Sequence, residues 1–449
     1  EMPRAIVLVV IDCLRADHVS GCGYVRETTP TLDELAAGGV LWEQAYSVSS
    51  WTKPAVLSML TGLYPSQHGA FEGVKRDRRE GLLTTDALPA DVPTLAERLT
   101  RAGWCCGAFI NNAQLGEFTG LNRGFECYLP AVGKADPLLA AFADWLRQNG
   151  SRPIFAYLHF LEAHWPYKPR RRHVALFGGD RDTNYFRDFS ARDYGRLRRG
   201  ISRGEATLRE DLLEQMVQMY DGAVRRLDGK LRELLSLLEE AGLRDDTALF
   251  VTADHGEEFL DHGKIGHGQS LHEELVHVPL VACIPGGPAG VRVREPVSLV
   301  DLAGTLLHVA GAADANAQPS VLPGGQRRAV VSELRIKRRY TQALRAGRWK
   351  LHRRFNVHDG GRGDLRRPAF ELGRSGTYQT ELQLYDLVDD PHEQVNLAGA
   401  ALARPDCERL CGELDSWWEM MMRSGSPGGR EVAIDAQVVA RLRALGYVD

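Results

Sequence analysis

Long apolar runs are missing from this chain. No stretch of the 449 residues approaches the roughly 20 consecutive apolar residues that a membrane-spanning helix needs. The longest early run, Ala5–Ile11, has the length of a buried strand and not the form of a signal peptide. We therefore expect no membrane association. The chain begins with Glu1 and not Met, so a removed leader stays open.

A strong excess of charge is missing as well. The formal net charge is −4, and this argues against general nucleic-acid binding by charge alone. Apolar residues make up 44% and charged residues 25% of the chain, which is ordinary for a soluble globular protein. We expect a small-molecule substrate and no nucleic-acid partner, and leave oligomerisation open.

The cysteines form no framework. Their spacing fits neither a set of disulfides nor a zinc knuckle, and several stand inside apolar runs where a thiol behaves as a small hydrophobe. They are Cys13, Cys22, Cys105, Cys106, Cys127, Cys283, Cys407 and Cys411. We interpret them as reduced and expect a cytoplasmic location, with a periplasmic or secreted one as the alternative if a leader has been removed.

Apolar runs of strand length alternate with helical stretches. The expected strands are Ala5–Ile11, Trp104–Ile110, Ile154–His159 and Ala248–Ala253. The expected helices between them are Thr31–Ala37, Pro54–Leu60, Val92–Arg101 and Asp136–Gln148, and a long amphipathic helix covers Glu210–Glu240. This alternation predicts an α/β sheet with right-handed crossovers, whose ligands bind beyond the carboxyl ends of the strands.

Two further segments depart from this pattern. Residues Arg170–Gly204 are basic, polar and irregular, and are either a solvated excursion or a lid over the substrate site. After about residue 325, short strands replace the alternation, at Ala329–Leu334, Thr341–Arg345, Trp349–Arg353 and Leu382–Leu387, with a helix near Cys407–Met421. We predict a catalytic domain over residues 1–325 and a smaller subdomain over residues 326–449.

A carboxylate ends the first apolar run. Asp12 comes directly after Ile11, and Cys13 is next. A carboxylate at the tip of a buried strand is costly to desolvate unless it is paired or bound to a metal. Asp12 is therefore either a metal ligand or a helix cap, and we interpret Asp17 as a structural cap or turn residue.

A hydroxyl residue begins the second motif. Two residues after Thr52 stands Pro54, which the first turn of a helix tolerates, and an apolar helical stretch comes next. Thr52 is either a simple helix cap or a nucleophile placed where a helix N-terminus attracts an anion.

Histidines gather after the fourth strand. Asp254 and His255 stand at its end, and His262 and His267 come within thirteen residues of the sequence. Carboxylate and imidazole together suit zinc or manganese, so we favour a metal site here over exposed histidines without a function.

The third strand ends in a second histidine-rich motif. His159 and His164 precede Trp165, Pro166 and Tyr167. This pattern indicates the rim of a substrate site, and the alternative is an aromatic turn with exposed histidines.

Together these motifs resemble the sulfatase family within the alkaline phosphatase superfamily, over nearly the whole chain and in the family's order. The matching pieces are the strand ending at Asp12, the run from Thr52 through Thr61 and Gly62, the run His164–Tyr167, Asp254–Gly256, and the tail Leu384–Leu397. The resemblance implies a large mixed, mostly parallel sheet flanked by helices, with a small C-terminal antiparallel α+β subdomain.

Three departures bear on function. Sulfatases carry a cysteine or serine, oxidised to formylglycine, where this chain has Thr52, and threonine cannot be processed in that way. The family's arginine four residues later is Val56, and its second N-terminal aspartate is Cys13. Threonine at this position is similar to the phosphodiesterases, phosphonate hydrolases and phosphoethanolamine transferases of the superfamily.

The resemblance implies a set of roles. One divalent cation, with zinc or manganese favoured and calcium open, is expected at Asp12, Thr52, Asp254 and His255. The expected catalytic residues are Thr52, Lys53, His164 and His267, and the expected substrate-binding residues are Asn111, His159 and Tyr167. Thr52 would attack and form a covalent intermediate, with no formylglycine involved.

The expected function is metal-dependent hydrolysis of phosphate diesters or phosphonate monoesters. A threonine sulfate cannot be released by elimination, as a formylglycine sulfate can, and this favours phosphoryl substrates. The alternatives are a sulfatase-like hydrolase that acts on aryl sulfates, alone or promiscuously among other esters, and a non-catalytic metal-stabilised binding protein.

Overall fold

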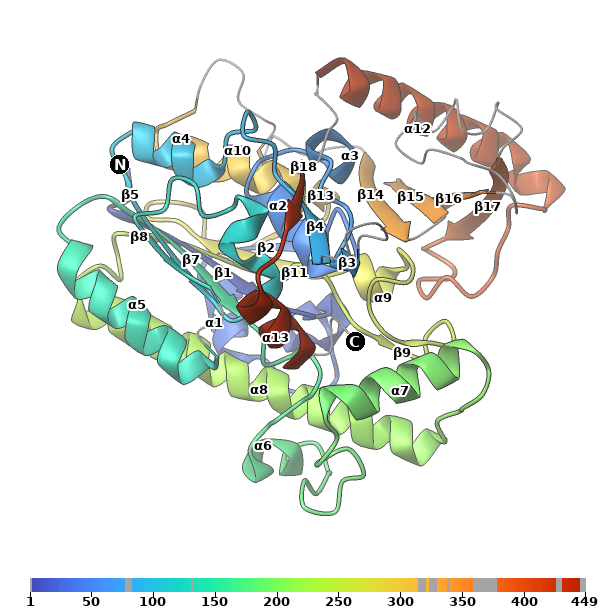
Figure 1. The fold of residues 1–449 in the computed structure, drawn as a ribbon, viewed down its shortest axis with the longest axis horizontal. Coiled ribbons are helices and arrows are strands. Elements are labelled where there is room, and N and C mark those ends of the chain that lie inside the picture. Colours follow the sequence, from blue (N-terminus) through green and yellow to red (C-terminus); the bar gives the residue numbers. More distant parts are fainter. Residues whose placement is uncertain are drawn as a thin grey trace.

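A mixed sheet organises the larger part of the molecule (Figure 1). The computed structural model describes residues 2–76, 83–130, 133–313, 320–322, 329–336, 339–357, 378–424 and 430–444. Within these residues the sheet has nine strands in the order β12-β2-β11-β8-β1-β7-β5-β6, with β13 paired to β2. The parallel centre consists of β1 (Ala5–Ile11), β7 (Ile154–Phe160), β8 (Thr247–Thr252) and β5 (Cys105–Ile110).

These four strands lie where the apolar runs predicted them. Every residue of β1, β5, β7 and β8 is buried, as parallel strands covered on both faces require. One edge is extended by β6 (Cys127–Leu129), which is parallel to β5. The other side is mixed, because β11 (His277–Cys283) runs antiparallel to both β8 and β2 (Val40–Tyr46). Two short strands, β12 (Val291–Val293) and β13 (Val297–Ser298), are parallel to β2.

Helices cover both faces of the sheet. One layer consists of α1 (Pro30–Gly38), α5 (Ala135–Asn149) and α8 (Glu210–Glu240), and the other contains α2 (Thr52–Met59), α4 (Leu95–Arg101) and α10 (Leu302–Val309). Figure 1 shows α5 and α8 below the sheet and α4 and α10 above it. The amphipathic α8 has the predicted bounds and buries its apolar stripe against the sheet.

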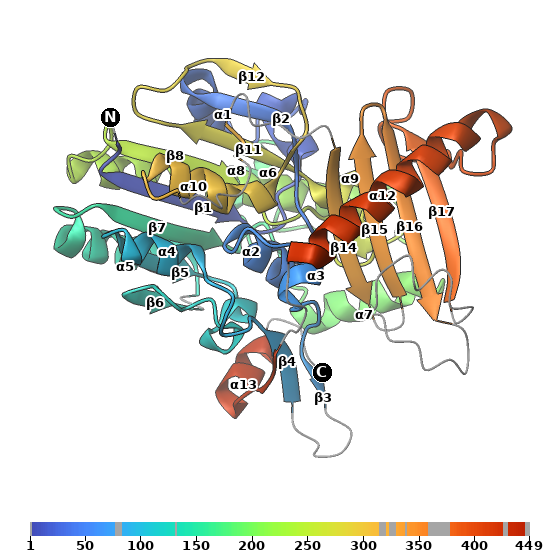
Figure 2. The same ribbon diagram turned by 90° about the horizontal axis from the view of Figure 1, so that it is seen from above.

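A second, antiparallel sheet forms after the larger one. Its strands β14 (Ala329–Ile336), β15 (Arg339–Ala346), β16 (Trp349–Val357) and β17 (Tyr378–Asp386) pair in chain order, and α12 (Arg404–Ser424) crosses one face (Figure 2). The apolar residues between this sheet and α12 form one cluster with Val48 and Tyr64 of the larger domain. The expected fold class is confirmed, and the predicted boundary between residues 325 and 326 lies outside the described residues.

The end of the chain returns to the larger domain. Strand β18 (Arg430–Ala433) pairs with β4 (Leu83–Ala87), which also pairs with β3 (Lys75–Arg76), and α13 (Ala436–Ala444) packs near the short 3₁₀ helix Ala113–Leu115. No local pattern in the sequence indicates this return. The remaining elements are α3 (Pro65–His68), α6 (Arg171–Ala175), α7 (Ala191–Ser202), β9 (Glu258–Phe259), β10 (Ile265–Gly266) and α9 (Glu273–Val276).

Two of the compositional expectations can be compared with the structure. All eight cysteines are free thiols. Among the described residues, no helix combines the length and the apolar character that crossing a bilayer requires.

Candidate active site

The carboxyl ends of the central strands bring the candidate residues together. Asp12 comes directly after β1, Asp254 stands two residues beyond β8, and Asn112 stands two residues beyond β5. The N-terminus of α2 points into the same place and carries Thr52. Residues from four distant parts of the chain therefore meet at one edge of the sheet, as the α/β topology predicts.

Thr52 is not a helix cap. It is the first residue of α2, and the capping position is occupied by Trp51, which makes no side-chain cap hydrogen bond. The Thr52 hydroxyl instead lies 3.4 Å from Asp12 Oδ2, 3.3 Å from His255 Nε2 and 3.3 Å from Asn112 Nδ2. The local sequence leaves capping and nucleophilic roles open, and these contacts favour the second.

Oxygen and nitrogen donors converge beside this hydroxyl. His255 Nδ1 lies 2.8 Å from the carbonyl oxygen of Gly256 and donates to it, which leaves the Nε2 lone pair directed inward. His255 Nε2 is 3.7 Å from Asp12 Oδ1 and 3.5 Å from Asp254 Oδ2. A histidine fixed by a carbonyl on its far nitrogen is a common arrangement for a metal ligand.

The two carboxylates lie deep in the site with histidines as neighbours. Asp12 and Asp254 are completely buried, and Asp254 Oδ2 has no hydrogen-bond partner. Burial and the neighbouring carboxylate of Asp12 raise the pKa of Asp254 well above its ordinary value. Burial alone would raise the pKa of Asp12 too, but the hydrogen bond from His159 and the nearby histidines lower it. An unpartnered buried carboxylate oxygen among hard and borderline donors is what a divalent cation would satisfy, so Asp12, Thr52, Asp254 and His255 fit the metal set that the family implies.

His159 supports this set from below and does not reach the substrate cavity. Its Nε2 lies 3.0 Å from Asp12 Oδ2, and its Nδ1 lies 2.7 Å from the hydroxyl of Tyr157. The side chain is completely buried. The structure thus assigns His159 the orientation of Asp12, whereas the sequence suggests contact with substrate.

The asparagine that reaches the site is Asn112, and not Asn111 as the sequence suggests. Asn112 Nδ2 donates to Asp12 Oδ2 at 2.7 Å, while the side-chain atoms of Asn111 have no hydrogen-bond partner and are buried. The reason is that successive side chains of a strand point to opposite faces. The Asn111 backbone N–H still continues the ladder of β5 by donating to the carbonyl oxygen of His159, so the side chain of the next residue, Asn112, is the one that turns toward the site. The paired asparagines after β5 were the only sequence signal for Asn112.

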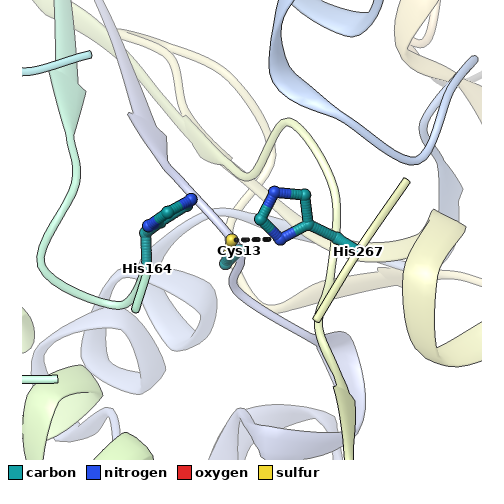
Figure 3. Close-up of side chains that lie close together, drawn as sticks. All are labelled: Cys13, His164 and His267. Carbon is teal, nitrogen blue, oxygen red and sulfur yellow. Dashed lines mark hydrogen bonds between the residues drawn. The ribbon is translucent and has the colours of Figure 1, made fainter. Parts of the chain in front are cut away.

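Two histidines flank a buried thiol at the cavity wall. Figure 3 shows Cys13 between the rings of His164 and His267, with its sulfur 3.5 Å from His267 Nδ1. Cys13 has a φ of 63°, an uncommon conformation for a residue other than glycine that is often found at functional sites. Burial and the carboxylates around it, led by Glu257, raise the pKa of the Cys13 thiol well above its ordinary value.

Burial disfavours the charged form of both histidines. Burial, together with the proximity of His255 and Arg198, lowers the pKa of His267 well below its ordinary value, and burial also lowers the pKa of His164. His267 Nδ1 lies 3.2 Å from Glu257 Oε1, a completely buried carboxyl group that no sequence pattern singles out. Burial raises the pKa of Glu257 as well. Together these groups form a largely buried, polar wall next to Thr52.

A cavity of about 430 Å³ opens onto this wall. His164 and His267 line it, and so do the residues on either side of Thr52, Trp51 and Lys53. Helix α7, from the segment Arg170–Gly204, also contributes to the lining, with Ala191, Tyr194, Gly195 and Arg198. The second half of that segment therefore lies at the mouth of the site as the lid hypothesis requires, whereas α6 packs against α8.

Lys53 and Tyr167 are placed differently from the expectation. Lys53 Nζ lies 2.7 Å from Thr85 Oγ1 and 2.8 Å from the carbonyl oxygen of Asp86, so its charge is directed into the wall of the cavity. Tyr167 is buried and packs against Trp165 and Tyr220. It is not among the described residues that line the cavity, because the chain turns at this point and directs the ring into the core.

A sequence model of a protein family decides the identity. The model described as Sulfatase matches residues 4–312, well over half of the 449 residues.

The chain belongs to the sulfatase family.

Individual sulfatases and a related hydrolase show the extent of the similarity. An ulvan-active sulfatase of Formosa agariphila is 24% identical over 477 residues, covering 93% of this chain and 75% of that protein. Human arylsulfatase A is 27% identical to this chain over 461 residues, and the match covers 90% of this chain and 85% of arylsulfatase A. The phosphonate monoester hydrolase of Agrobacterium radiobacter shares the fold, with a TM-score of 0.70 at 20% identity over 93% of this chain and 96% of that one.

Membership of the sulfatase family and the arrangement of the site identify the chain as an ester hydrolase. Sulfatase-family members typically bind a divalent metal, and the donor set around Asp12 and Asp254 is available for one here. The side chain that faces these donors from the start of α2 is the hydroxyl of Thr52.

Proposed function

We propose that this sulfatase-family chain hydrolyses phosphate diesters or phosphonate monoesters, with Thr52 as the nucleophile. One observation carries the proposal: the hydroxyl of Thr52, which caps nothing, is directed at Asp12, His255 and Asn112, while its chain neighbours Trp51 and Lys53 line the cavity. Threonine cannot become formylglycine, so the route by which sulfatases release sulfate is closed to this side chain.

The Thr52 hydroxyl would be activated by a metal ion held by the proposed ligands. Asp12, Asp254, His255 and the Thr52 oxygen would hold one divalent cation, which when bound lowers the pKa of a hydroxyl and polarises a substrate oxygen. Carboxylate and imidazole donors favour zinc or manganese.

The side chains of the chain itself perform the transfer. Thr52 Oγ1 attacks the phosphorus atom in line with the departing alcohol, forming an oxygen–phosphorus bond and breaking the bond to the leaving group. The hydroxyl proton passes to the buried carboxylates, of which Asp12 Oδ2 lies 3.4 Å away. Water then cleaves the phosphothreonine ester and regenerates the hydroxyl. Asn112 holds the Asp12 carboxylate and the Thr52 oxygen in one geometry through both steps.

His164 and His267 serve the substrate side. Both line the cavity, and their ring centroids are 5.0 Å apart, a spacing that suits two contacts to one tetrahedral group. We assign them to the non-bridging oxygens of the substrate, to which their ring N–H groups donate, while the departing alcohol takes its proton from solvent water. Arg198 and Arg335 also line the cavity and give it a positive balance that suits an anionic ester.

A panel of nitrophenyl esters tests this proposal. Purified protein with a measured metal content is assayed on a phosphate diester, a phenylphosphonate monoester, a phosphate monoester and an aryl sulfate. We expect the diester or the phosphonate to have the highest kcat/KM, because one divalent cation compensates a singly charged phosphoryl group better than a dianion.

The second candidate function is hydrolysis of aryl sulfate esters. It is favoured by the family and by relatives such as arylsulfatase A. A highest kcat/KM on the aryl sulfate would replace the phosphoryl proposal with this one, and comparable values on both would indicate an enzyme that acts on several ester classes.

A further inference from the structure

A second group of metal-ligating side chains lies away from the candidate active site. It joins the loop between β9 and β10, the start of α9, strand β16 and the turn after β17. Its members are His262, His272, Glu274, His352 and Glu393. One donor atom from each of His262, His272 and Glu274 lies within 4.8 Å of the others, and the same holds for His272, His352 and Glu393.

His272 is the unexplained member of the group. It is 7% exposed, and neither of its ring nitrogens has a hydrogen-bond partner. The nearest carboxylate contact is Glu274 Oε1, at 4.0 Å from Nδ1. A buried imidazole without a partner is costly, and the nitrogen that carries the lone pair of this ring is available to a metal ion.

His262 is held in place by two hydrogen bonds. Its Nε2 donates to the carbonyl oxygen of Glu393 at 3.1 Å, and its Nδ1 lies 3.0 Å from Glu274 Oε1. Burial lowers the pKa of His262, but the hydrogen bonds and charges of Glu274 and Glu393 together outweigh it and raise the pKa to about 9, so a metal ion bound at Nδ1 would displace a proton from that nitrogen. The His262 ring is stacked on that of His272, with centroids 3.6 Å apart.

The charges leave room for a cation. Glu273 and Glu393 share Lys350, which lies 2.7 Å from Glu273 Oε1 and 3.2 Å from Glu393 Oε2, while Glu274 is paired with His262. Once a metal ion displaces the His262 proton, three carboxylates face one ammonium, and the two remaining negative charges would be balanced by one divalent ion. The ring centroid of His352 is 4.8 Å from that of His272, and its Nε2 lies 2.7 Å from Glu393 Oε1.

We propose that His262, His272 and Glu274 bind one divalent transition-metal ion, with His352 as the fourth ligand. Three imidazoles and one carboxylate suit tetrahedral zinc, and harder ions such as calcium and magnesium prefer oxygen donors. This site is separate from the candidate active site and does not depend on the proposed reaction.

A metal ion at this site would connect the larger domain with the C-terminal sheet. His262 and His272 bracket the loop that carries His267 at the cavity wall, whereas His352 belongs to the C-terminal sheet. A metal at this point would hold that loop against β16 and the turn at Glu393. The site would therefore be structural, with an effect on activity only through the placement of His267.

Cobalt titration of the full chain tests the proposal. The background is Asp12→Asn/Asp254→Asn, which removes both carboxylates of the catalytic metal set. After chelator treatment, we expect this variant to bind about one equivalent of Co²⁺, with the intense visible absorption of a tetrahedral nitrogen-rich site. Adding His272→Gln should abolish that band and the bound equivalent, while the matched control His308→Gln, an exposed histidine on α10, should leave both unchanged.

Three results would overturn the proposal. They are no bound cobalt in the background variant, a cobalt content unaffected by His272→Gln, and equal losses with His308→Gln. If His272→Gln does not fold, as judged by circular dichroism, His352→Gln takes its place, and it should weaken cobalt binding about tenfold or more. Unchanged affinity in that variant would show that the cluster is a stacked imidazole group without a metal.

Discussion

Removing the hydroxyl of Thr52 separates catalysis from folding. Thr52→Val keeps the shape of the side chain and deletes Oγ1, whose contacts with Asp12, His255 and Asn112 are 3.3 to 3.4 Å long. Net hydrogen bonds contribute about 0.5–1.5 kcal/mol each, and these are long ones. Asn112 also keeps its 2.7 Å bond to Asp12, so we expect the free energy of unfolding to fall by about 1 kcal/mol at most.

The rate should respond on a different scale. Loss of a nucleophile that forms a covalent intermediate lowers kcat by about 10³-fold or more, which corresponds to about 4 kcal/mol in the activation free energy. Thr52→Ala should behave like Thr52→Val. Thr52→Ser keeps the hydroxyl and is the matched control, expected within about tenfold of the wild-type rate.

The assay combines urea unfolding with initial rates on the best ester of the nitrophenyl panel. Mass spectrometry of acid-quenched enzyme should find a phosphoryl group on residue 52, both in the wild type and in the Thr52→Ser variant. A Thr52→Val enzyme that hydrolyses the ester at near the wild-type rate would refute the reasoning, and water activated directly at the metal site would then be the nucleophile.

Three other predictions concern charge in the structure. Asp254→Asn should stabilise the metal-stripped chain, because it replaces a buried carboxyl group whose Oδ2 has no partner, and should lower kcat/KM by about 100-fold or more. Calorimetry and the ester assay measure the two effects. Arg198→Lys should raise KM about tenfold with little effect on the free energy of unfolding, since the guanidinium of Arg198 contacts the His267 carbonyl oxygen and Gln269 at the cavity. An unchanged KM would exclude a role of Arg198 in substrate binding. Burial raises the pKa of Glu333 from its ordinary value of 4.5 to about 7, although hydrogen bonds from Tyr340 and Ser66 oppose the shift. Between these two pH values the folded chain keeps a proton that the unfolded chain has lost. The free energy of unfolding therefore falls as the pH rises from about 4.5 to 7. Glu333→Gln should therefore reduce the decline in unfolding free energy between about pH 4.5 and 7 by up to about 3 kcal/mol, and an unchanged slope would contradict the shift.

The sequence determined the parallel centre of the fold and much of the site. Apolar runs of strand length specify β1, β5, β7 and β8, because a strand covered on both faces has few polar positions. Topology then places the residues just beyond each strand at one edge of the sheet, so Asp12 and Asp254 were predictable as neighbours. The amphipathic spacing of α8 likewise predicted its bounds.

Tertiary structure decided the direction of individual side chains. Thr52 at a helix start fits a cap and a nucleophile equally well in sequence, and only the position of α2 against β1 directs its hydroxyl to Asp12. The choice between Asn111 and Asn112 depends on where the ladder of β5 ends, and small shifts of a strand end reverse a side chain.

Contacts between segments that are distant in the chain could not be predicted from the sequence. His262, His272 and His352 come from separate elements, and no periodicity or spacing connects the third with the other two. The return of β18 to β4 is equally non-local. Local patterns indicate which residues are buried and in which element, whereas the packing of the two sheets determines which polar groups share a site and which are left without partners.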